Sequence, residues 1–418
     1  MSMSKRIVVK IGSSLLAHSQ ELTLRYAFMH GLMSDIARLK EQGYEVVLMS
    51  SGAVALGLNA IGKSPEDAGI LDKQAAAAYG QPLLLNAYKQ VAHEFGFDIA
   101  QILVTLGDME GRRRFINIKN TLERLFDNGI MPIVNENDTV TTEELRVGDN
   151  DRLAAKVAQM IQADHLVLLT SIDGLYDRPP SEPGAEFIEK LEDVSTYLAA
   201  TTGTNALGSG GMYTKLQAAN MAQHAGCSTY LAATTGTNAL GSGGMYTKLQ
   251  AANMAQHAGC STIIAEGIIE NPILSVLEGE RRHTLCTAIG TPASAWKVWL
   301  TNRLQVAGSL ILKQSAADEL VSTPQAIKHT DIVSVADTFQ KGDILHIYDE
   351  KGQEIARGLT NFGSDEVLLL ARHPESTTAE LLGYSAVPDV ITTKNMVILN
   401  DNHLSWEVPT EDLQQVAS

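Results

Sequence analysis

The sequence predicts an α/β protein with a three-layer, open, mostly parallel sheet and a second, small, mostly β domain. In the first two-thirds of the chain, short runs rich in Val, Ile and Leu alternate with longer amphipathic stretches. That alternation is typical of a parallel sheet covered by helices on both faces. After about residue 282 the runs become short, β-type and broken by Gly and Asp. At 418 residues the chain is also long enough for two cores.

Six apolar runs are expected to form the first sheet. They lack strict apolar–polar alternation, as strands buried on both faces do. We expect helices between them, over residues 22–40, 73–94 and 117–126. The expected strands are, in chain order, "RIVVK" at 6–10, "EVVLMS" at 45–50, "DIAQILVT" at 98–105, "MPIVN" at 131–135, "HLVLLT" at 165–170 and "STIIA" at 261–265.

The change in pattern predicts the domain organisation. We expect a first domain over residues 1–283, a linker over 284–304, a second domain over 305–395 and a tail over 396–418. The β-type runs of the second domain are "SLIL", "DIVSVAD", "KGDILHIYDEKGQEIARGL" and "EVLLLA", and "DEKGQE" is a hairpin-turn signal. This domain holds 7 Lys and Arg against 13 Asp and Glu, a balance of 7 − 13 = −6.

A 33-residue segment occurs twice in tandem, letter for letter, at residues 195–227 and 228–260. A period of this size is found in solenoid proteins, but solenoids need about three or more stacked units to close a core. Evolved repeats also diverge at surface positions. Perfect identity therefore indicates a recent tandem duplication or an assembly artefact, and the chain is best interpreted first without one copy.

The overall composition narrows the class of protein. With 44% hydrophobic and 19% charged residues, the chain has the composition of a soluble globular protein. Its net charge of −16 argues against a surface that binds nucleic acid or membrane over the whole molecule. The three cysteines form no disulfide framework, since two are copies of one position. With no signal-peptide core and no apolar stretch near ~20 residues, we expect a cytoplasmic protein without a membrane partner.

Small, polar and charged residues follow the expected strands of the first domain. "VVKIGSS" places Lys10 at the end of the first strand, and "MSSGAV" places Ser51 after the second. "NEND" follows the fourth strand, "VGDND" opens the next helix, and "GSGGMYTK" leads into a later one. Each motif alone is common in plain turns and caps. Because the carboxyl ends of parallel strands meet at one edge, together they suit phosphoryl transfer. The chain has neither a Walker motif nor the protein-kinase motifs.

The chain resembles a known family, the glutamate 5-kinases of the amino-acid kinase superfamily. The ordered motifs that carry the resemblance are "VVKIGSS", "SSGAVALG", "DMEGRRRFINIKNTL", "PIVNENDTV", "VGDNDRLAA", "LLTSIDGLYD" and "GSGGMYTKLQAA". The second domain is similar to the PUA domain appended to many bacterial members, although its opening, "LILKQSAADELVSTPQAIKH", departs from that pattern. The resemblance implies the amino-acid kinase fold and ATP-dependent phosphorylation of the γ-carboxylate of L-glutamate, the first step of proline biosynthesis.

The resemblance also implies roles for single residues. Lys10 and the lysine of "GSGGMYTK" would bridge phosphate oxygens, and Asp151 would hold both lysines. Asp138 would bind the α-ammonium group of glutamate, while Ser51 and Asn150 would donate hydrogen bonds to a carboxylate. The implied ATP-binding set is Lys10, Gly12, Ser13, Thr170, Ser171, Ser242, Gly243, Gly244, Met245, Tyr246, Thr247 and Lys248, or in the first copy Ser209, Gly210, Gly211, Met212, Tyr213, Thr214 and Lys215.

Cofactor and partners follow from the same resemblance. No His–Cys cluster suggests a transition metal held by the protein, and Mg²⁺ is expected to arrive with ATP, bound largely through its phosphates. The resemblance further implies a homo-oligomer, a tetramer, and feedback inhibition by proline. The acidic balance of residues 305–395 opposes RNA binding by the second domain.

We expect the second repeat copy to form the ATP loop. Its helix would run directly into "STIIAEG", a compact aliphatic strand. The first copy would instead place "STYLAATT" in the sheet, with Tyr230 and a threonine pair in a packed position. With the second copy in place, the extra residues only enlarge a surface loop, which costs little entropy.

Three alternatives stay open at the level of sequence. The first is another amino-acid kinase, of the acetylglutamate kinase or aspartokinase type, although "VNEND" and "GDND" favour glutamate 5-kinase. The second is an RNA-binding protein that acts through the PUA-like domain. The third is a folded relic in which the duplication has inactivated the enzyme.

Overall fold

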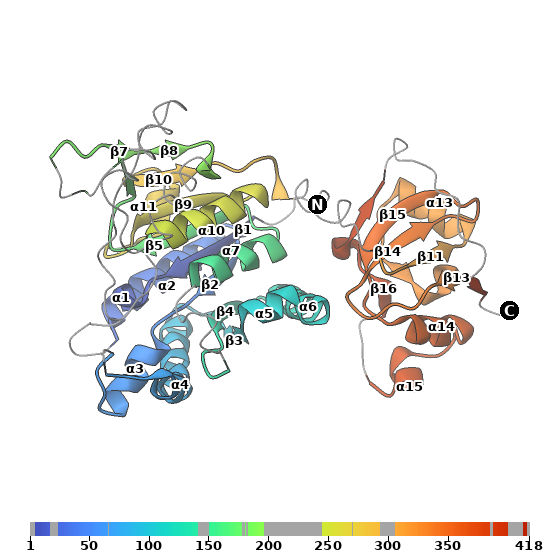
Figure 1. Cartoon of the computed structure of the whole chain (residues 1–418), viewed down its shortest axis with the longest axis horizontal. Coiled ribbons are helices and arrows are strands. Elements are labelled where there is room, and N and C mark those ends of the chain that lie inside the picture. The colour runs from blue at the N-terminus through green and yellow to red at the C-terminus, as the bar shows by residue number, and fades with distance from the viewer. Residues whose placement is uncertain are drawn as a thin grey trace, which may run out of the picture. The chain divides into compact units, whose positions relative to one another are not determined.

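The computed structural model describes residues 5–16, 24–65, 67–140, 150–177, 180, 183–195, 245–269, 271–292, 306–384, 388–399 and 413–415. The chain divides into two compact units, one of residues 1–106 with 121–295 and one of residues 107–120 with 296–418. Figure 1 shows a sheet in each. No helix among the described residues is long and apolar enough to cross a membrane.

The first unit is built on an eight-stranded sheet in the order β3-β4-β2-β1-β5-β9-β10-β8. The strands from β3 to β9 run parallel, and β10 is antiparallel to β9. All six expected strands are confirmed, with ends that differ by a residue or less. The strands are β1 (Arg6–Ile11), β2 (Glu45–Met49), β3 (Ile99–Val104), β4 (Met131–Glu136), β5 (His165–Thr170), β8 (Lys190–Leu191), β9 (Ser261–Glu266) and β10 (His283–Cys286), with a separate pair β6 (Leu175–Tyr176) and β7 (Phe187–Ile188).

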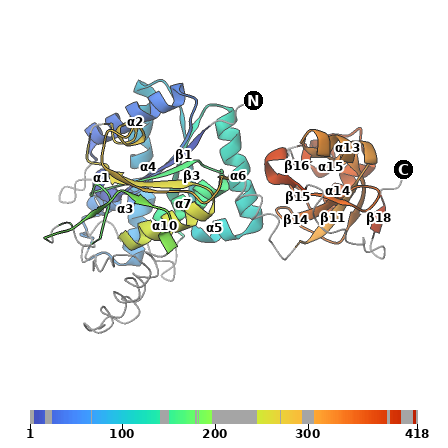
Figure 2. The same ribbon diagram turned by 90° about the horizontal axis from the view of Figure 1, so that it is seen from above.

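Helices cover both faces of this sheet, which gives the three expected layers. Figure 2 shows α2 on one side of the sheet and α7 and α10 on the other. The expected helices over residues 22–40, 73–94 and 117–126 correspond to α2, α4 and α6. The helices of the first unit are α1 (Ser13–Leu16), α2 (Tyr26–Glu41), α3 (Ala53–Ala60), α4 (Ile70–Glu94), α7 (Asn150–Met160), α10 (Met245–His257) and α11 (Leu274–Leu277). Two more, α5 (Leu106–Glu110) and α6 (Arg112–Asp127), include residues 107–120, which are assigned to the second unit.

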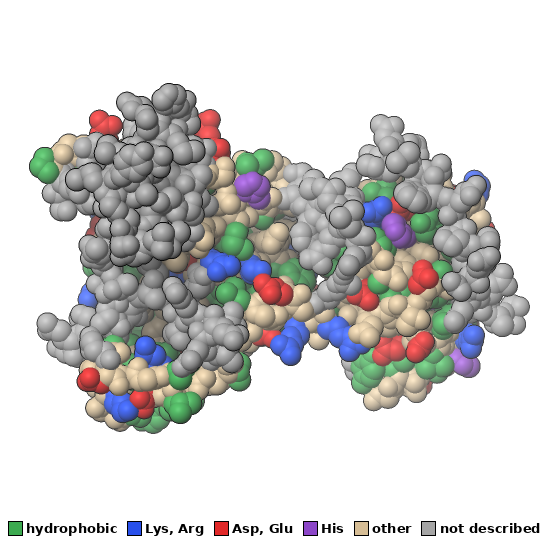
Figure 3. Space-filling view, viewed as in Figure 1, with side chains coloured by type: hydrophobic (Ala, Val, Ile, Leu, Met, Phe, Trp, Pro, Cys, Tyr) green, Lys and Arg blue, Asp and Glu red, His purple; other side chains and the backbone are tan. Residues whose placement is uncertain are grey.

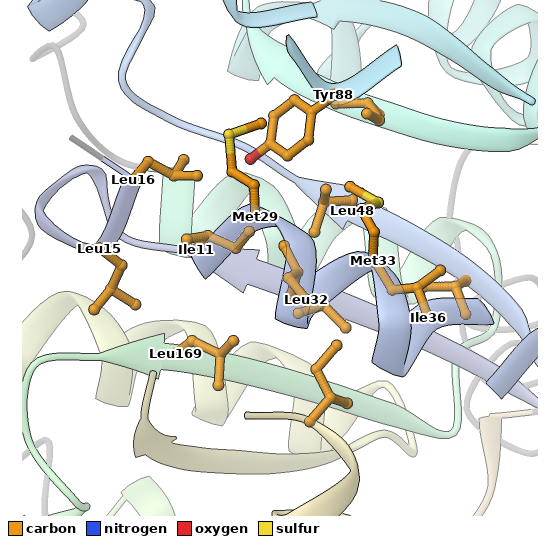
Figure 4. Close-up of a cluster of buried hydrophobic side chains, with 14 of the residues drawn as sticks. Ile11, Leu15, Leu16, Met29, Leu32, Met33, Ile36, Leu48, Tyr88 and Leu169 are labelled. Carbon is orange, nitrogen blue, oxygen red and sulfur yellow. The ribbon is translucent and has the colours of Figure 1, made fainter. Parts of the chain in front are cut away.

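The alternation of side chains along β1 determines where Lys10 lies. Ile7, Val9 and Ile11 enter the main hydrophobic core with residues of α2 and α4. Figure 4 shows Ile11 in this core beside side chains of α2, Leu48 and Tyr88. Because successive side chains of a strand point to opposite faces, Lys10 lies on the other face, where α7 packs. The central strand therefore presents one lysine to α7 near its carboxyl end.

Glycine allows helices α3 and α4 to touch backbone to backbone. A Cβ added at Gly57 would lie 1.8 Å from the carbonyl oxygen of Ala76, and one added at Gly80 would lie 1.9 Å from that of Ala53. Neither position has room for a side chain without separating the helices. The start of α3, and the loop that precedes it, are thus held close to the middle of α4.

The second unit contains a six-stranded sheet in the order β17-β15-β14-β11-β13-β18. The expected hairpin at "DEKGQE" is confirmed, since β14 and β15 pair antiparallel and the N–H of Asp349 donates to the carbonyl of Gln353 at 3.0 Å. Figure 3 shows acidic and basic side chains interspersed on the visible face of this unit. Its elements are β11 (Gly308–Leu312), α13 (Gln314–Ser322), β12 (Ile327–Lys328), η1 (His329–Asp331), β13 (Ile332–Ala336), β14 (Ile344–Tyr348), β15 (Glu354–Leu359), α14 (Ser364–Arg372), α15 (Thr378–Leu382), β16 (Asp389–Ile391), η2 (Thr393–Asn395), β17 (Met396–Ile398) and β18 (Leu413–Gln415).

One expected β-type run of the second domain is wrong, because "EVLLLA" forms helix α14. Gly363 precedes the helix, and its N–H donates to the carboxylate of Glu366 at 2.8 Å. Asp365 and Glu366 place negative charge in the first turn, where the helix dipole favours it. Val367 and Leu370 are three residues apart and both buried, which is the spacing of one helix face. A short run of leucines alone does not distinguish strand from helix.

The outer strands extend both sheets beyond the domain bounds expected from the sequence. β10 pairs with β9, so the first sheet continues beyond residue 283, where the linker was expected to begin. β17 pairs with β15 and β18 with β13, so residues of the expected tail contribute to the second sheet. Strands of three or four residues are too short to produce a recognisable pattern, which explains the difference.

Candidate active site

Two lysines from distant parts of the chain meet one buried carboxylate. Nζ of Lys10 lies 2.6 Å from Oδ1 of Asp151, and Nζ of Lys248 lies 3.1 Å from its Oδ2. The hydroxyl of Thr247 also donates to this Oδ2, at 3.0 Å. Lys10 and Lys248 are each 6% exposed and Asp151 is 1% exposed. The cluster carries two positive charges and one negative charge, which leaves one positive charge in excess.

The fold brings these side chains together at the carboxyl edge of the parallel sheet. Lys10 is the last residue but one of β1, between β2 and β5. Asp151 lies in the first turn of α7 and Lys248 in the first turn of α10, and the two helices pack against each other. The N-termini of both helices thus lie at the cluster, and a helix N-terminus attracts negative charge.

The ionisation of Asp151 depends on the two lysines. Burial alone would raise its pKa, but attraction to Lys10 and Lys248, with hydrogen bonds from both, outweighs burial and holds the pKa well below its usual range. Burial lowers the pKa of Lys248, the carboxylate of Asp151 opposes this, and the charge of Lys10 adds to the lowering. The carboxylate is therefore ionised at neutral pH, and it supports two ammonium groups that would otherwise repel each other.

The end of β1 leaves space beside the lysines. The N–H of Gly12 donates to the carbonyl of Leu169 at 3.3 Å. Among the described residues, the nearest atom to a Cβ added at Gly12 would be that oxygen, at 3.7 Å, so these parts of the fold leave room for a side chain there. Glycine instead leaves the space open, which fits close approach of a phosphate to the backbone. Ser13 begins α1 directly after it.

Ser51 and Asn150 are joined in a second polar group at the same edge. Nδ2 of Asn150 donates to Oγ of Ser51 at 2.8 Å, to the carbonyl of Ser50 at 3.1 Å and to Oδ1 of Asn135 at 3.3 Å. Oδ1 of Asn150 is buried and has no hydrogen-bond partner among the described residues. Asn150 is thus arranged to accept a hydrogen bond from a ligand, whereas the family resemblance implies that it donates one.

Asp138 lies in the loop after β4, which ends at Glu136. Burial raises the pKa of Asp138 to about 6. Among the described residues no basic group offsets that effect of burial. A bound cation would stabilise the ionised form of the carboxylate. This environment suits a ligand that carries an ammonium group.

The other residues expected to bind ATP lie only partly within the described structure. Thr170 is half-buried at the end of β5, and Ser171 is exposed directly after it. Met245 and Tyr246 begin α10, but their side chains lie outside the described residues. The same holds for Ser242, Gly243 and Gly244, and for the first-copy loop Ser209, Gly210, Gly211, Met212, Tyr213, Thr214 and Lys215. Within the described ranges, no three His, Cys, Asp or Glu residues group as a metal site.

Sequence reasoning missed the residues that support the Ser51–Asn150 group. Asn135 stands in the quoted "NEND" but was not singled out, although a polar residue at the end of a buried strand is a usable signal. Its Nδ2 donates to Oε1 of Gln81 at 2.7 Å. The hydroxyls of Ser50 and Tyr88 lie 3.0 Å apart. Gln81 and Tyr88 belong to α4, far from any motif, so no sequence signal indicates them.

Two family comparisons match the two parts of the chain. The amino acid kinase family matches residues 5–233, and the PUA domain matches residues 308–382. The first range takes in the first repeat copy and ends within the second, whereas in the structure the helix of the second copy leads into β9, which pairs with β5 along its length. The sequence that follows each copy is what differs, and the segment after the second copy is the one that forms the paired strand β9.

Individual relatives match nearly the whole chain. The glutamate 5-kinase of Ruegeria sp. (strain TM1040) is 36% identical over 405 residues, 95% of this chain and 99% of the relative. That of Brucella anthropi is 38% identical over 401 residues, 94% of this chain and 96% of the relative. Among solved structures, carbamate kinase from Giardia lamblia bound to AMP-PNP is similar at a TM-score of 0.46 and 16% identity, over 69% of this chain and 100% of that one. The chain therefore belongs to the amino acid kinase family and, within it, to the glutamate 5-kinases.

Proposed function

We propose that the protein transfers the γ-phosphoryl group of ATP to the γ-carboxylate of L-glutamate, which forms γ-glutamyl phosphate for proline biosynthesis. The observation that carries the proposal is the buried cluster of Lys10, Asp151 and Lys248, next to the polar group of Ser51 and Asn150. The family membership and the names of the relatives support the same reaction.

The two lysines of the cluster would neutralise negative charge on the phosphoryl group during its transfer. The transferred group passes between two anionic oxygens, so catalysis depends on positioning and on neutralising charge. Lys10 and Lys248 would contact phosphate oxygens, and Asp151 would keep both ammonium groups at one point. Mg²⁺ would be held largely through the phosphates of ATP and would compensate part of their charge. Gly12, Ser13, Thr170, Ser171 and the loop at 242–248 would hold the nucleotide.

The polar group of Ser51 and Asn150 would select glutamate as the substrate. Oγ of Ser51 accepts a hydrogen bond from Asn150, so its own hydrogen is left to donate to a carboxylate. Oδ1 of Asn150 and the carboxylate of Asp138 would accept hydrogen bonds from the α-ammonium group. An N-acetylated amino acid carries no charge at that nitrogen and would leave Asp138 without its cation. This argues against the acetylglutamate kinase alternative.

The proposal extends to regulation, assembly and location. Proline shares the α-ammonium and α-carboxylate groups of glutamate, so Ser51, Asp138 and Asn150 could hold it as a feedback inhibitor. A tetrameric homo-oligomer and a cytoplasmic location rest on the resemblance and the composition described above. RNA binding by residues 305–395 is disfavoured by their balance of 7 basic against 13 acidic residues.

The test of the proposed function is acyl-phosphate formation with ATP and Mg²⁺, trapped as hydroxamate. L-Glutamate, L-aspartate and N-acetyl-L-glutamate are compared side by side. We expect clear preference for L-glutamate because only it offers both the ammonium group and a carboxylate at the right distance. Preference for either of the other two would sink the assignment, and no turnover with any of them would favour the inactive relic.

Replacing one lysine in each copy tests the phosphoryl clamp. Lys248→Ala should lower kcat at saturating ATP by about 10²–10³-fold, the usual loss for one preorganised charge contact. Lys215→Ala, the identical change in the other copy, is the matched control and should leave kcat within about twofold of wild type. Loss confined to Lys215→Ala would reverse the assignment, and equal partial loss in both would mean that the two copies exchange.

The pH dependence of glutamate binding tests the role of Asp138. Its pKa is raised to about 6, so it is ionised above that pH and protonated below it. Because only the carboxylate attracts an ammonium group, KM for glutamate should rise as pH falls, approaching about tenfold per unit well below pH 6. The γ-carboxyl group of free glutamate titrates lower, near about 4.3. Asp138→Asn should have a high KM that is flat from pH 5 to 7; a flat wild-type profile would refute this role.

A further inference from the structure

A chain of three side-chain amides runs from helix α4 to the proposed amino-acid site. Oε1 of Gln81 accepts from Nδ2 of Asn135 at 2.7 Å, and Oδ1 of Asn135 accepts from Nδ2 of Asn150 at 3.3 Å. All three residues are buried, at 8%, 2% and 8% exposure. These hydrogen bonds link α4, the end of β4 and the start of α7.

The orientation of these three amides follows from a backbone N–H group, which can donate a hydrogen bond but cannot accept one. The backbone N–H of Glu136 can only donate, and it donates to Oδ1 of Asn135 at 2.9 Å. Nδ2 of Asn135 must therefore face the other way, where Oε1 of Gln81 is its acceptor. With Oδ1 of Asn135 fixed, the amide nitrogen of Asn150 turns toward it, toward Ser51 and toward the carbonyl of Ser50.

The consequence appears at Asn150, the last of the three hydrogen-bonded amides. The amide group of Asn150 has two hydrogens and three acceptors around its nitrogen, so the nitrogen is fully used. Its Oδ1 is left buried without a hydrogen-bond partner in the part of the chain that the structure describes. A buried acceptor without a partner is costly, and a donor supplied by a ligand would relieve that cost.

The backbone around Gln81 is held firmly against the loop that it serves. Gly80, the residue before it, lies against the carbonyl of Ala53, and no side chain could fit between them. Ala53 begins α3, directly after the loop of Ser51 and Gly52, and Gly52 has a φ of 97°, in the left-handed region that favours glycine. The distance between Gln81 and this loop is therefore fixed by direct contact of two backbones.

We propose that Gln81 is a positioning residue that stabilises the orientation in which the Asn150 amide presents its carbonyl oxygen to the amino-acid substrate. By accepting from Asn135 it favours the arrangement in which Asn150 presents its carbonyl oxygen, a hydrogen-bond acceptor suited to the α-ammonium group. Gln81 thereby contributes to selection of substrates with a free amino group. The inference rests on the proposed function, since it concerns the same site.

The test separates the ammonium group from the rest of the substrate. KM for glutamate is compared with the inhibition constant of glutarate, which has both carboxylates of glutamate but no amino group. In Gln81→Met, KM for glutamate should rise by about five- to thirtyfold, the range for one hydrogen bond lost. The inhibition constant of glutarate, kcat and KM for ATP should each stay within about twofold. Gln81→Glu keeps an acceptor at this position and should restore KM to within about threefold.

Two controls make the result specific. Gln90→Met makes the same chemical change on an exposed part of α4 and should leave every constant unchanged. In an Asn150→Ala background, Gln81→Met should change KM by less than about twofold, because Gln81 acts through Asn150. Gln81→Ala, which favours the helix, replaces Gln81→Met if the latter does not fold.

Several outcomes would overturn the proposal. A glutarate constant that rises by the same factor as KM for glutamate would mean that Gln81 only supports the fold of the site. An unchanged KM in both Gln81→Met and Gln81→Ala would mean that it has no role. A full effect in the Asn150→Ala background would exclude action through Asn150. If the wild-type protein does not phosphorylate glutamate at all, the proposed function fails instead.

Discussion

The first unit depends on one buried carboxylate, Asp151, which holds the ammonium groups of Lys10 and Lys248 within about 3 Å of its oxygens. Burying charge is costly, and removing one partner of a buried ion pair typically costs about 3–5 kcal/mol, because the other charge is left uncompensated. Within this group of three, two lysines face one carboxylate, an arrangement suited to binding an anion. The same contact therefore joins β1, α7 and α10 and creates the attraction for a phosphate.

The sequence predicts the first sheet and the lysine cluster well, for physical reasons. Strands covered on both faces need Val, Ile and Leu at nearly every position, and such runs are visible in β1, β5 and β9. Charged residues that end these runs, such as Lys10, have no place in a packed core unless they are paired. The family resemblance then names Lys10, Asp151 and Lys248, or its copy Lys215, as one group, although the sequence gives none of the distances between them.

Other features carry no local signal. "EVLLLA" has the composition of a strand, and the capping interaction at Gly363 that makes it a helix is seen only in three dimensions. Gln81 and Asn135 meet across two elements, and neither sequence neighbourhood indicates the other. The short strands β10, β17 and β18 form because a longer neighbour offers unpaired backbone groups, and their own residues show no clear alternation. Such features depend on the tertiary structure, and local pattern cannot reveal them.

The duplicated segment shows how a fold can accept an insertion. Helix α10 ends at His257, Gly259 adopts a left-handed φ of 74°, and β9 follows at Ser261. A Cβ at Gly259 would lie 2.2 Å from the backbone of Thr291, so glycine is needed there. Both copies carry this glycine, since they are identical, and only the sequence after it differs. That strand has Ile263 and Ile264 at its centre, both buried in the sheet.

Attraction between the carboxylate of Asp151 and the amine of Lys248 joins α7 to α10 at the cluster. It is tested most directly by carbon-13 NMR titration of the lysine side chains in wild type and Asp151→Asn, with the Lys248 signal assigned from Lys248→Arg. Burial and the charge of Lys10 lower the pKa of Lys248, and Asp151 opposes them. We predict that Asp151→Asn moves the Lys248 titration to lower pH than in wild type. A pKa that is unchanged or higher in Asp151→Asn would contradict the account.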